Sequence, residues 1–328
     1  QIDVLLTAWS GTANMTQMVL ISIGAGLLSA LLFASVLTGS LLAIVLQIFA
    51  QLPIQSASLT FGPRAGLIAA VAAVAALLLV SGLPSQTVSY SLNFAAPALL
   101  ASYLAGLRNT ELPVDQLSSW YPLGRLLSFV GGAAVLIFLL LGLYSDFTPE
   151  SAVLAIENQA TILLEGAVDS GEVPPQTITQ IAVFFVAVFP FVATAGIVAI
   201  TGLNLVLAMR IARRYGTFAR PATSITALKI PRAVHLTALA ALLALWMIGS
   251  TPPLLTSVAG AASALVILSG FAALHALTRR LASRSIILFA VYGSIILFTF
   301  PLLLILILGW IDGFLNLRGL PQSNASNS

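Results

Sequence analysis

The chain of 328 residues contains no cysteine and only two histidines, His235 and His275. Without cysteine, the protein can form no disulfide, thiolate metal site or thiol nucleophile. Because the histidines are few and no HExxH motif is present, we expect no zinc site. The sequence also contains no Walker motif, so any process driven by ATP would need a partner protein. We therefore expect neither a metal nor a cofactor.

Charged side chains are scarce, at 7% of residues, and 59% of residues are hydrophobic. Soluble proteins carry about 25% charged residues, and so few ions could not cover the surface of a soluble protein of this length. Lipid can replace water as the outer solvent of a membrane protein. The pI is near 9.6, and the basic residues follow the loops between the apolar runs. The basic stripes expected of nucleic-acid-binding proteins are missing. The sequence predicts a protein that contacts the lipid bilayer and binds no nucleic acid.

Several apolar runs approach the roughly 20 residues that a helix needs to cross a bilayer. The first covers residues 18–37, and a shorter run of residues 41–52 meets Pro53. This second run is either tilted, re-entrant or continued past the proline. The remaining runs cover residues 65–83, 88–107, 126–144, 181–209, 234–248, 254–277 and 285–311.

These runs predict an all-α fold, a polytopic bundle of eight or nine transmembrane helices. One transmembrane domain would cover residues 18–312. A polar N-terminal segment of residues 1–17 precedes it, and a polar tail of residues 313–328 follows it.

The charges in the connecting segments are sorted by sign. Basic residues gather around Arg108 and Arg125, in the loop of residues 210–232, and from Arg279 to Arg284. The connector of residues 145–178 instead carries six acids and no base. Basic loops stay in the cytoplasm, so we expect the acidic connector to be extracytoplasmic. Counting outward gives nine crossings and places the tail with Arg318 outside. A hairpin at Pro301 would change that end.

The acidic connector has a helical pattern of its own. Val153, Ile156, Ala160 and Leu163 recur at helical spacing, which predicts an amphipathic helix. We expect this extracytoplasmic helix to end before Gly171. It either covers the ends of other helices, which is the commoner role, or forms a lid over a binding cavity.

No Asp, Glu, Lys or Arg lies in the middle of a predicted span. Buried charges in a membrane are costly and usually functional, so their absence argues against a proton relay. It also argues against an intramembrane enzyme, which would need paired acids or a histidine base. We interpret Asp312 as a residue at the membrane interface, and His235 and His275 as interfacial rather than catalytic. The sequence predicts that the protein is not an enzyme.

Neutral polar residues do occur within the spans, and each needs an internal partner or a wet cavity. Pro190 predicts a kink, because proline removes a backbone hydrogen bond, and Thr194, Thr201 and Asn204 follow it. Together with Asn93, they are candidate contacts for a small neutral ligand. A purely structural kink is the commoner explanation of such a proline.

Small residues repeat every four positions in the first predicted span, at Ser22, Gly26, Ala30 and Ala34. They share one helix face, and small side chains at that spacing allow two helices to approach closely. The face either packs inside the chain or docks a partner subunit.

The connector at residues 120–125 has two readings. Trp120 and Tyr121 are typical of an aromatic anchor at the membrane surface, with Arg125 reaching the lipid headgroups. Alternatively, Arg125 docks a cytoplasmic partner protein.

Four short motifs carry a resemblance to a known family. They are WYPLGR at 120–125, IGAGL at 23–27 with SAL at 29–31, RAGLIAA at 64–70, and the ending from FPLLL at 300–304 through GWID at 309–312 to Leu317 and Arg318. They resemble the uncharacterised YybS-like family of predicted bacterial membrane proteins, along nearly the whole chain. The resemblance implies a multi-pass protein of the bacterial inner (cytoplasmic) membrane.

That family has no established activity, but it is often grouped by distant similarity with the S components of energy-coupling-factor transporters. Those proteins bind a small molecule and dock on a transmembrane scaffold through a small-residue stripe on the first helix. Ala30 and Ala34 have a comparable spacing here.

Two functions therefore remain open. The first is an S-component-like transport subunit for a small neutral molecule, working with a separate ATPase-driven scaffold. Its cavity would lie beneath the acidic helix, lined by the candidate ligand residues. The second is a non-catalytic scaffold or accessory subunit of a larger membrane complex, docking through small-residue faces and the basic loop of residues 210–232.

Overall fold

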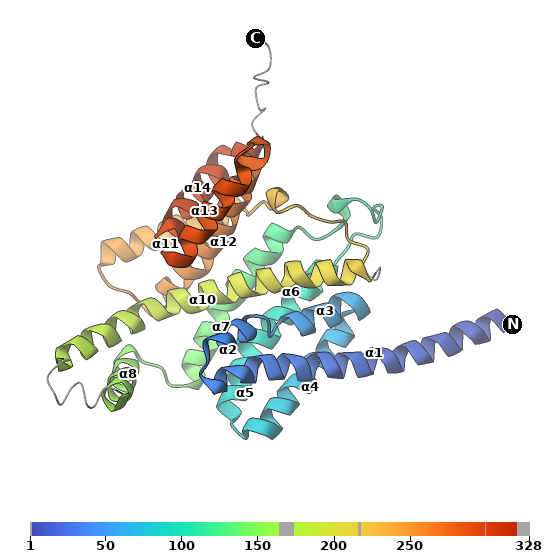
Figure 1. Ribbon diagram of the computed structural model, residues 1–328, viewed down its shortest axis with the longest axis horizontal. Coiled ribbons are helices and arrows are strands. Elements are labelled where there is room, and N and C mark those ends of the chain that lie inside the picture. Colours follow the sequence, from blue (N-terminus) through green and yellow to red (C-terminus); the bar gives the residue numbers. More distant parts are fainter. Residues whose placement is uncertain (1, 164–173, 216–217, 299, 320–328) are drawn as a thin grey trace, which may run out of the picture. The chain divides into compact units, whose positions relative to one another are not determined.

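The computed structural model describes residues 2–163, 174–215, 218–298 and 300–319. Within these ranges the regular structure is helical (Figure 1), apart from an isolated bridge between Arg108 and Trp120. The chain divides into two compact units. Unit 1 comprises Gln1–Ala133 and Ile197–Thr223, and unit 2 comprises Ala134–Gly196 and Ser224–Ser328. Helices α7 (Leu123–Tyr144) and α10 (Pro175–Arg214) contribute residues to both units.

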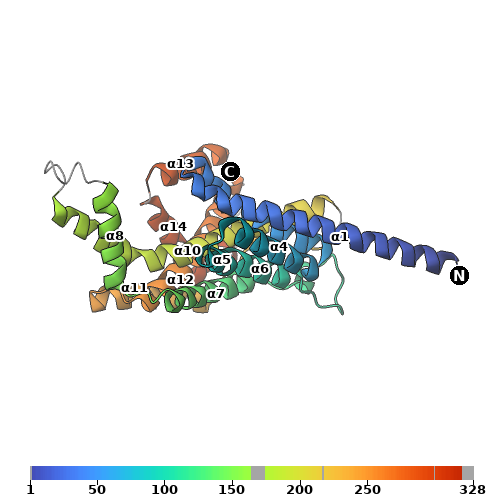
Figure 2. The ribbon, with the colours of Figure 1, turned by 90° about the horizontal axis from the view of Figure 1, so that it is seen from below.

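Unit 1 is built around closely packed N-terminal helices. They are α1 (Ile2–Ala34), α2 (Leu41–Ile48), α3 (Leu52–Phe61), α4 (Pro63–Ser81), α5 (Pro84–Tyr90), the π-helical turn Ser91–Ala95, and α6 (Ala96–Gly106). Helix α1 packs along α4 and α3, and α3 packs on α6 (Figures 1 and 2). The shared core is rich in alanine, with Ala30, Ala57, Ala69, Ala73 and Ala98 buried. Small side chains allow these helices to approach closely.

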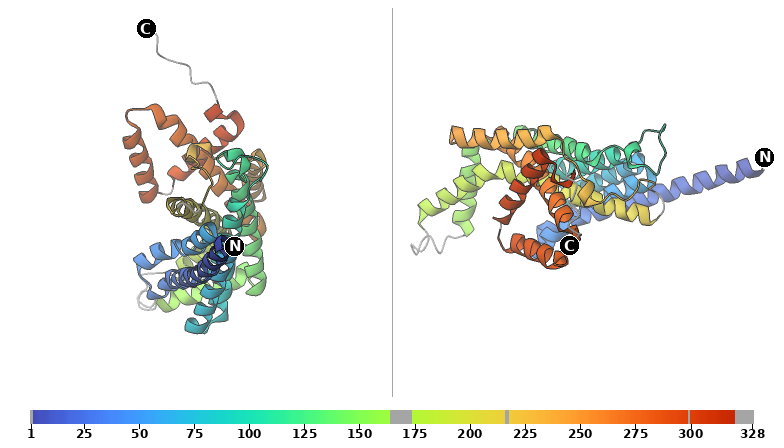
Figure 3. Two further views of the ribbon diagram at one scale, coloured as in Figure 1. Left: turned by 90° about the vertical axis from the view of Figure 1, so that its right-hand side faces the viewer. Right: turned by 90° about the horizontal axis from the view of Figure 1, so that it is seen from above.

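Unit 2 is centred on α12 (Pro253–Leu277). In the most apolar stretch of α12 about 72% is buried inside the protein, whereas in the other helices long enough to span a membrane the buried share is 28–44%. Helices α11 (Arg232–Ile248) and α14 (Pro301–Leu315) pack on it, and α13 (Arg284–Leu297) packs on α14. These helices form the orange-to-red group in Figure 3. A side chain at Gly270 would collide with the Ile305 carbonyl, and one at Gly309 with the Val266 carbonyl, so glycine permits this close packing.

The all-α membrane class is confirmed, but the count of eight or nine spans is not. Six helical stretches in the described residues are long and apolar enough to cross a bilayer. They are Met15–Thr38, Leu41–Phe61, Pro63–Ser81, Leu123–Tyr144, Gln176–Arg214 and Pro253–Arg280. Helices α11, α13 and α14 are shorter apolar helices. The run expected at 88–107 is divided among α5, the π-helical turn and α6.

Two prolines account for the local differences from the sequence prediction. The second apolar run continues past Pro53 as α3 and reaches Phe61. The last run is divided ahead of Pro301, with Phe298 in extended conformation. The resulting helices α13 and α14 have 14 and 15 residues. Each is about 22 Å long, which is shorter than the hydrocarbon core of about 30 Å.

The polar segments also form helix where the structure describes them. Helix α1 begins at Ile2, so it extends through most of the polar N-terminal segment. The predicted amphipathic helix of the acidic connector is α8 (Pro149–Leu163). Glu165, Asp169, Glu172 and the end expected before Gly171 lie outside the described residues.

Candidate functional site

The second membrane segment, in unit 1, is broken near its middle. Helix α2 ends at Ile48 and α3 begins at Leu52, with a turn at residues 49–51. Pro53 has no backbone N–H, so the helical hydrogen bond that it would donate to the Phe49 carbonyl cannot form. Backbone groups in a membrane must be satisfied internally, and a broken helix therefore needs side chains from its neighbours.

Those side chains come from α1 and α10. Asn204 Nδ2 donates to the Ile48 carbonyl at 2.7 Å, and Ser29 Oγ donates to the Ala50 carbonyl. The Ser29 hydroxyl also lies 2.6 Å from the Tyr90 hydroxyl. All three side chains are fully buried. The break is thus held by polar contacts inside the helical bundle of unit 1.

Two buried amides, Gln51 just before α3 and Gln55 within it, extend this polar region. Gln51 Nε2 donates to the Asn93 carbonyl at 3.3 Å. Gln55 Nε2 lies 3.4 Å from both Gln51 Oε1 and the Thr201 carbonyl. Gln51 and Gln55 are one helical turn apart, and neither is exposed. They connect the π-helical turn Ser91–Ala95, through the Asn93 carbonyl, to α10.

Asn93 lies in the π-helical turn Ser91–Ala95, a rare conformation that is frequent at functional sites. Its carbonyl would normally accept a hydrogen bond from the residue four positions later, but Pro97 has no N–H to donate. Gln51 supplies the missing donor. A second irregular helix therefore contributes an unwound carbonyl to the same polar region.

Three buried oxygens in this region have no hydrogen-bond partner: Gln55 Oε1, Thr201 Oγ1 and Asn204 Oδ1. We call these residues the oxygen cluster. The amide orientations are fixed, because Asn204 Nδ2 contacts the Ile48 and Ile200 carbonyls and a flipped amide would place oxygen against oxygen. Each unpaired buried group costs about 1–3 kcal/mol. The cluster can therefore accept a hydrogen-bond donor or a cation.

Three of the four predicted ligand residues meet here. Thr201 and Asn204 bring unpartnered side-chain oxygens to this polar region, whereas Asn93 contributes its backbone carbonyl and its side-chain amide donates to Ser89. Thr194 does not belong to the region, because it lies in unit 2 with its hydroxyl 2.8 Å from the Ser257 carbonyl. The sequence prediction missed Gln55, since the predicted second segment ended at Leu52. The four-residue spacing from Gln51 could have identified it.

The small-residue stripe of α1 packs inside the chain. Ser22, Gly26 and Ala30 are buried and Ala34 is half-buried. A Cβ added at Gly26 would collide with the Ala69 carbonyl of α4. The structure therefore shows internal packing for this stripe at Gly26, and docking of a partner subunit stays a prediction.

The connector with Trp120 folds back into unit 1. The Trp120 indole donates to the Val114 carbonyl at 3.0 Å, and its ring packs edge-on against Phe218. Trp120 is 8% exposed, so its ring packs against protein and is not free to contact lipid headgroups. Arg125, in the first turn of α7, is exposed.

Arg220 fastens the same connector from a buried position. Its guanidinium donates to the Ala105 and Tyr121 carbonyls, both at 3.1 Å. Burial, and then repulsion from Arg213, lowers the pKa of Arg220 to about 10, so the group stays charged at neutral pH. Its stability contribution changes only as the pH rises through about 10 toward 12.5. Stability then increases, because the folded state releases its proton first.

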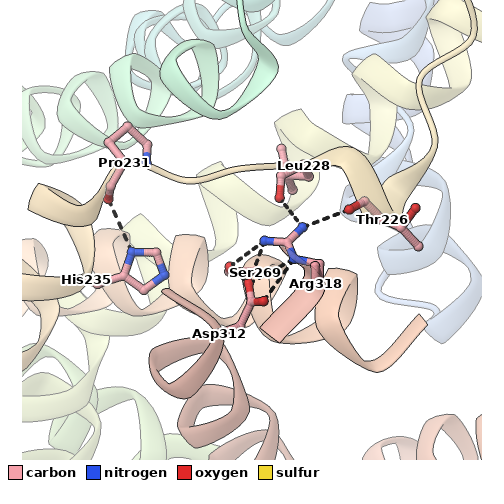
Figure 4. Close-up of polar contacts among 7 residues, drawn as sticks. All are labelled: Thr226, Leu228, Pro231, His235, Ser269, Asp312 and Arg318. Atoms are coloured by element: carbon pink, nitrogen blue, oxygen red, sulfur yellow. Dashed lines mark hydrogen bonds and ion pairs between the residues drawn. The ribbon is translucent and has the colours of Figure 1, made fainter. Parts of the chain in front are cut away.

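A buried ion pair forms a second polar centre, in unit 2 (Figure 4). Arg318 NH2 lies 2.6 Å from Asp312 Oδ2, and its Nε lies 3.0 Å from both carboxylate oxygens. Ser269 Oγ donates to the same carboxylate at 3.2 Å. Arg318 NH1 donates to the Thr226 carbonyl at 3.0 Å and to the Leu228 carbonyl. Asp312 is thus 3% exposed and paired inside unit 2.

This pair corrects the predicted position of the C-terminal tail. The tail with Arg318 was expected on the opposite side of the membrane from the loop of residues 210–232. Arg318 instead binds carbonyls of that loop at Thr226 and Leu228. The hairpin at Pro301 explains the difference, because α13 and α14 return the chain to the side from which α13 starts.

His235, in the first turn of α11, lies beside the ion pair and is fully buried (Figure 4). Its Nδ1 is 3.2 Å from the Pro231 carbonyl, and Trp310 Nε1 donates to the His235 carbonyl at 3.1 Å. A side chain at Gly313 would collide with the imidazole ring. His235 therefore packs α11 against α14. His275 is 2.8 Å from the Tyr292 hydroxyl.

Three cavities lie apart from these polar centres. The cavity between α8 and α10 in unit 2 has a volume of about 740 Å³, and Phe147, Ala155, Phe184 and Phe189 line it. A neighbouring cavity of about 500 Å³ reaches Glu150 and the start of α12. A third, of about 580 Å³, lies beside α1 and α3 in unit 1. None of the three is lined by Asn93, Thr194, Thr201 or Asn204.

A family model described as "Predicted membrane protein (DUF2232)" matches residues 27–313. The match starts within α1, ends within α14 and includes the broken segment, the oxygen cluster and Asp312. The chain belongs to this family. No curated protein and no solved structure matches the chain. Membership in DUF2232 establishes a membrane protein with several apolar helices and leaves its activity to be inferred from the site.

Proposed function

We propose that this DUF2232 protein is a substrate-binding subunit of a membrane transport system for a small neutral molecule. The cavity between α8 and α10 carries the proposal. Its volume of about 740 Å³ falls in the range of about 300–1,000 Å³ that is usual for small-molecule sites. Its lining of Phe147, Phe184, Phe185 and Phe189 suits an uncharged, largely apolar molecule with a flat face.

The position of α8 supports access from outside the cell. Ala152, Ala155 and Ile156 of α8 form one wall of the cavity, and the first half of α10 forms the other. Helix α10 is 40 residues long and carries Arg213 and Arg214 in its last turn. By the positive-inside rule that end is cytoplasmic, and α8 then covers the extracytoplasmic end. The host membrane would be the bacterial inner (cytoplasmic) membrane, as the YybS-like resemblance implies.

The broken second segment is the second support. Discontinuous helices with unwound carbonyls recur near the substrate and ion sites of transporters. Here the turn at residues 49–51 and the π-helical turn Ser91–Ala95 both present carbonyls to polar side chains. A subunit of the S-component kind needs no catalytic residues of its own, because a separate ATPase-driven scaffold would supply the energy.

The alternative is a scaffold or accessory subunit of a larger membrane complex. It is favoured by the exposed Arg125 on α7 and by the exposed Arg279 and Arg280 after α12. These cationic groups, with the loop of residues 210–232, would bind an acidic cytoplasmic partner.

Native mass spectrometry of the gently purified protein separates the two functions. Transport predicts a co-purifying small molecule and an ATPase pair. In Ala155→Trp the indole fills the cavity, so the small molecule should be lost. Asn158→Trp is the control, because Asn158 is exposed on α8 and does not line the cavity. Recovery of another membrane complex, with no small molecule in either variant, would favour the scaffold instead.

A further inference from the structure

We infer that the oxygen cluster of unit 1 is a binding site for a monovalent alkali cation. The atoms left without a hydrogen-bond partner in this cluster are all oxygens. The amide nitrogens of Gln55 and Asn204 contact carbonyl or amide oxygens, whereas their oxygens contact no donor. The cluster therefore offers acceptors only, apart from the Thr201 hydroxyl. Such a site excludes anions and suits a cation or a hydrogen-bond donor.

The absence of charge in the cluster selects the type of cation. Divalent ions in proteins are usually bound by carboxylates, and no group of three or more His, Cys, Asp or Glu in the described residues could hold a metal ion. Gln55, Thr201 and Asn204 supply one neutral oxygen each. Neutral hydroxyl, amide and carbonyl oxygens are suited to a singly charged hard ion, whose desolvation is less costly than that of a divalent ion.

Thr201 shows that the cluster differs from ordinary helix packing. Hydroxyls within the helices of this chain commonly donate to the carbonyl four residues earlier, as in Ser102 to Ala98 and Thr194 to Pro190. Thr201 is fully buried on α10 and makes no such bond. It is one helical turn from Asn204 on the same face. The two residues of α10 with unpartnered oxygens are therefore neighbours on one helix face, and Gln55 Nε2 reaches the Thr201 carbonyl from α3.

The broken segment provides the setting in which such an ion binds. In transporters with discontinuous helices, unwound carbonyls and helix ends coordinate Na⁺ near the middle of the membrane. Asn204 contacts the last carbonyl of α2, at Ile48, so the cluster adjoins a half-helix C-terminus with its partial negative charge. An ion here would join α3 to α10 and stabilise the break. This inference concerns unit 1 and does not depend on the cavity beneath α8.

Cation-dependent stability of the purified full chain tests the site. The melting temperature is measured by tryptophan fluorescence during titration with NaCl, LiCl or KCl, with choline chloride holding the ionic strength constant. A bound cation stabilises the folded state in a saturable manner, so Na⁺ should raise the melting temperature above that in choline. Direct binding of ²²Na⁺ to the same sample should saturate over the same concentration range.

Matched variants connect the effect to the cluster. Thr201→Val removes one ligand while keeping the shape of the side chain, and it should raise the half-maximal Na⁺ concentration about tenfold or more. Thr201→Ser should keep the wild-type concentration. Ser263→Ala is the control, because Ser263 is a buried, unpartnered hydroxyl in unit 2. Its Na⁺ dependence should equal that of the wild type.

Two results would overturn the inference. One is a wild-type protein whose melting temperature is the same in Na⁺, Li⁺, K⁺ and choline and which binds no ²²Na⁺; a buried water would then occupy the cluster. The other is an equal loss of Na⁺ dependence in Thr201→Val and Ser263→Ala. Neither result bears on the small molecule tested with Ala155→Trp, so the two proposals can fail separately.

Discussion

Asp312→Asn should destabilise unit 2 by breaking its buried ion pair. The Asp312 side chain is 1% exposed and that of Arg318 is 10% exposed, so water compensates little for the lost charge. Removing one partner of a buried pair costs about 3–5 kcal/mol. Arg318 keeps the Thr226 and Leu228 carbonyls as acceptors, and the cost in stability should therefore lie at the lower end of this range. We expect about 3 kcal/mol, or roughly a hundredfold in the unfolding equilibrium.

The assay is reversible unfolding in mixed micelles of a mild detergent and SDS. Arg318→Gln should cost a similar amount, and the double variant Asp312→Asn/Arg318→Gln should cost clearly less than the sum of the two. Glu150→Gln and Arg280→Gln are controls at exposed positions, with expected changes within about 0.5 kcal/mol. A cost below about 1 kcal/mol for Asp312→Asn, or strict additivity in the double variant, would refute the pairing.

Further predictions concern packing and the connector. Gly26→Ala should destabilise the protein by about 1–3 kcal/mol, because its Cβ collides with α4. Gly24→Ala, with open space at its Cβ, should be neutral or slightly stabilising; equal effects in SDS unfolding would contradict the α1–α4 contact. Gly309→Ala should likewise destabilise α14, whereas Gly293→Ala on α13 should not; thermal melting compares the two. Arg220→Gln should cost about 3 kcal/mol, since it removes two charged hydrogen bonds, and greater protease sensitivity of the connector would report it. Unchanged sensitivity would contradict that role.

The helical elements were largely predictable from the sequence, because apolar length and proline act locally. The run ending at Ile311 contained Pro301, and a hairpin there was one of the predicted alternatives. Its consequence could not be derived from the sequence. Arg318 binds the Thr226 carbonyl across 92 positions of chain, and no local pattern encodes such a contact. Counting basic loops therefore gave the wrong side for the tail.

The candidate site was predicted in part for the same reason. Asn93, Thr201 and Asn204 stood out as polar residues in apolar runs, and buried polar groups must find partners. Which partners they find depends on tertiary packing, and this packing placed Thr194 against Ser257 in unit 2 instead. Gln55 lay beyond the expected end of its segment at Pro53. The role of Gly26 was left open by the sequence, because a face of small residues can pack equally well against a helix of the same chain or a helix of a partner subunit.

The membrane topology on which the transport proposal depends can be measured by single-cysteine labelling, since the chain contains no cysteine of its own. Exposed positions are available in α8 at Asn158, in the basic loop at Ala227 and at the end of α14 at Leu315. A membrane-impermeant maleimide should label Asn158→Cys from outside intact cells, and Ala227→Cys and Leu315→Cys only in inverted vesicles. Labelling of Asn158→Cys from the same side as Ala227→Cys would contradict this membrane topology. Labelling of Leu315→Cys from the opposite side to Ala227→Cys would contradict it as well.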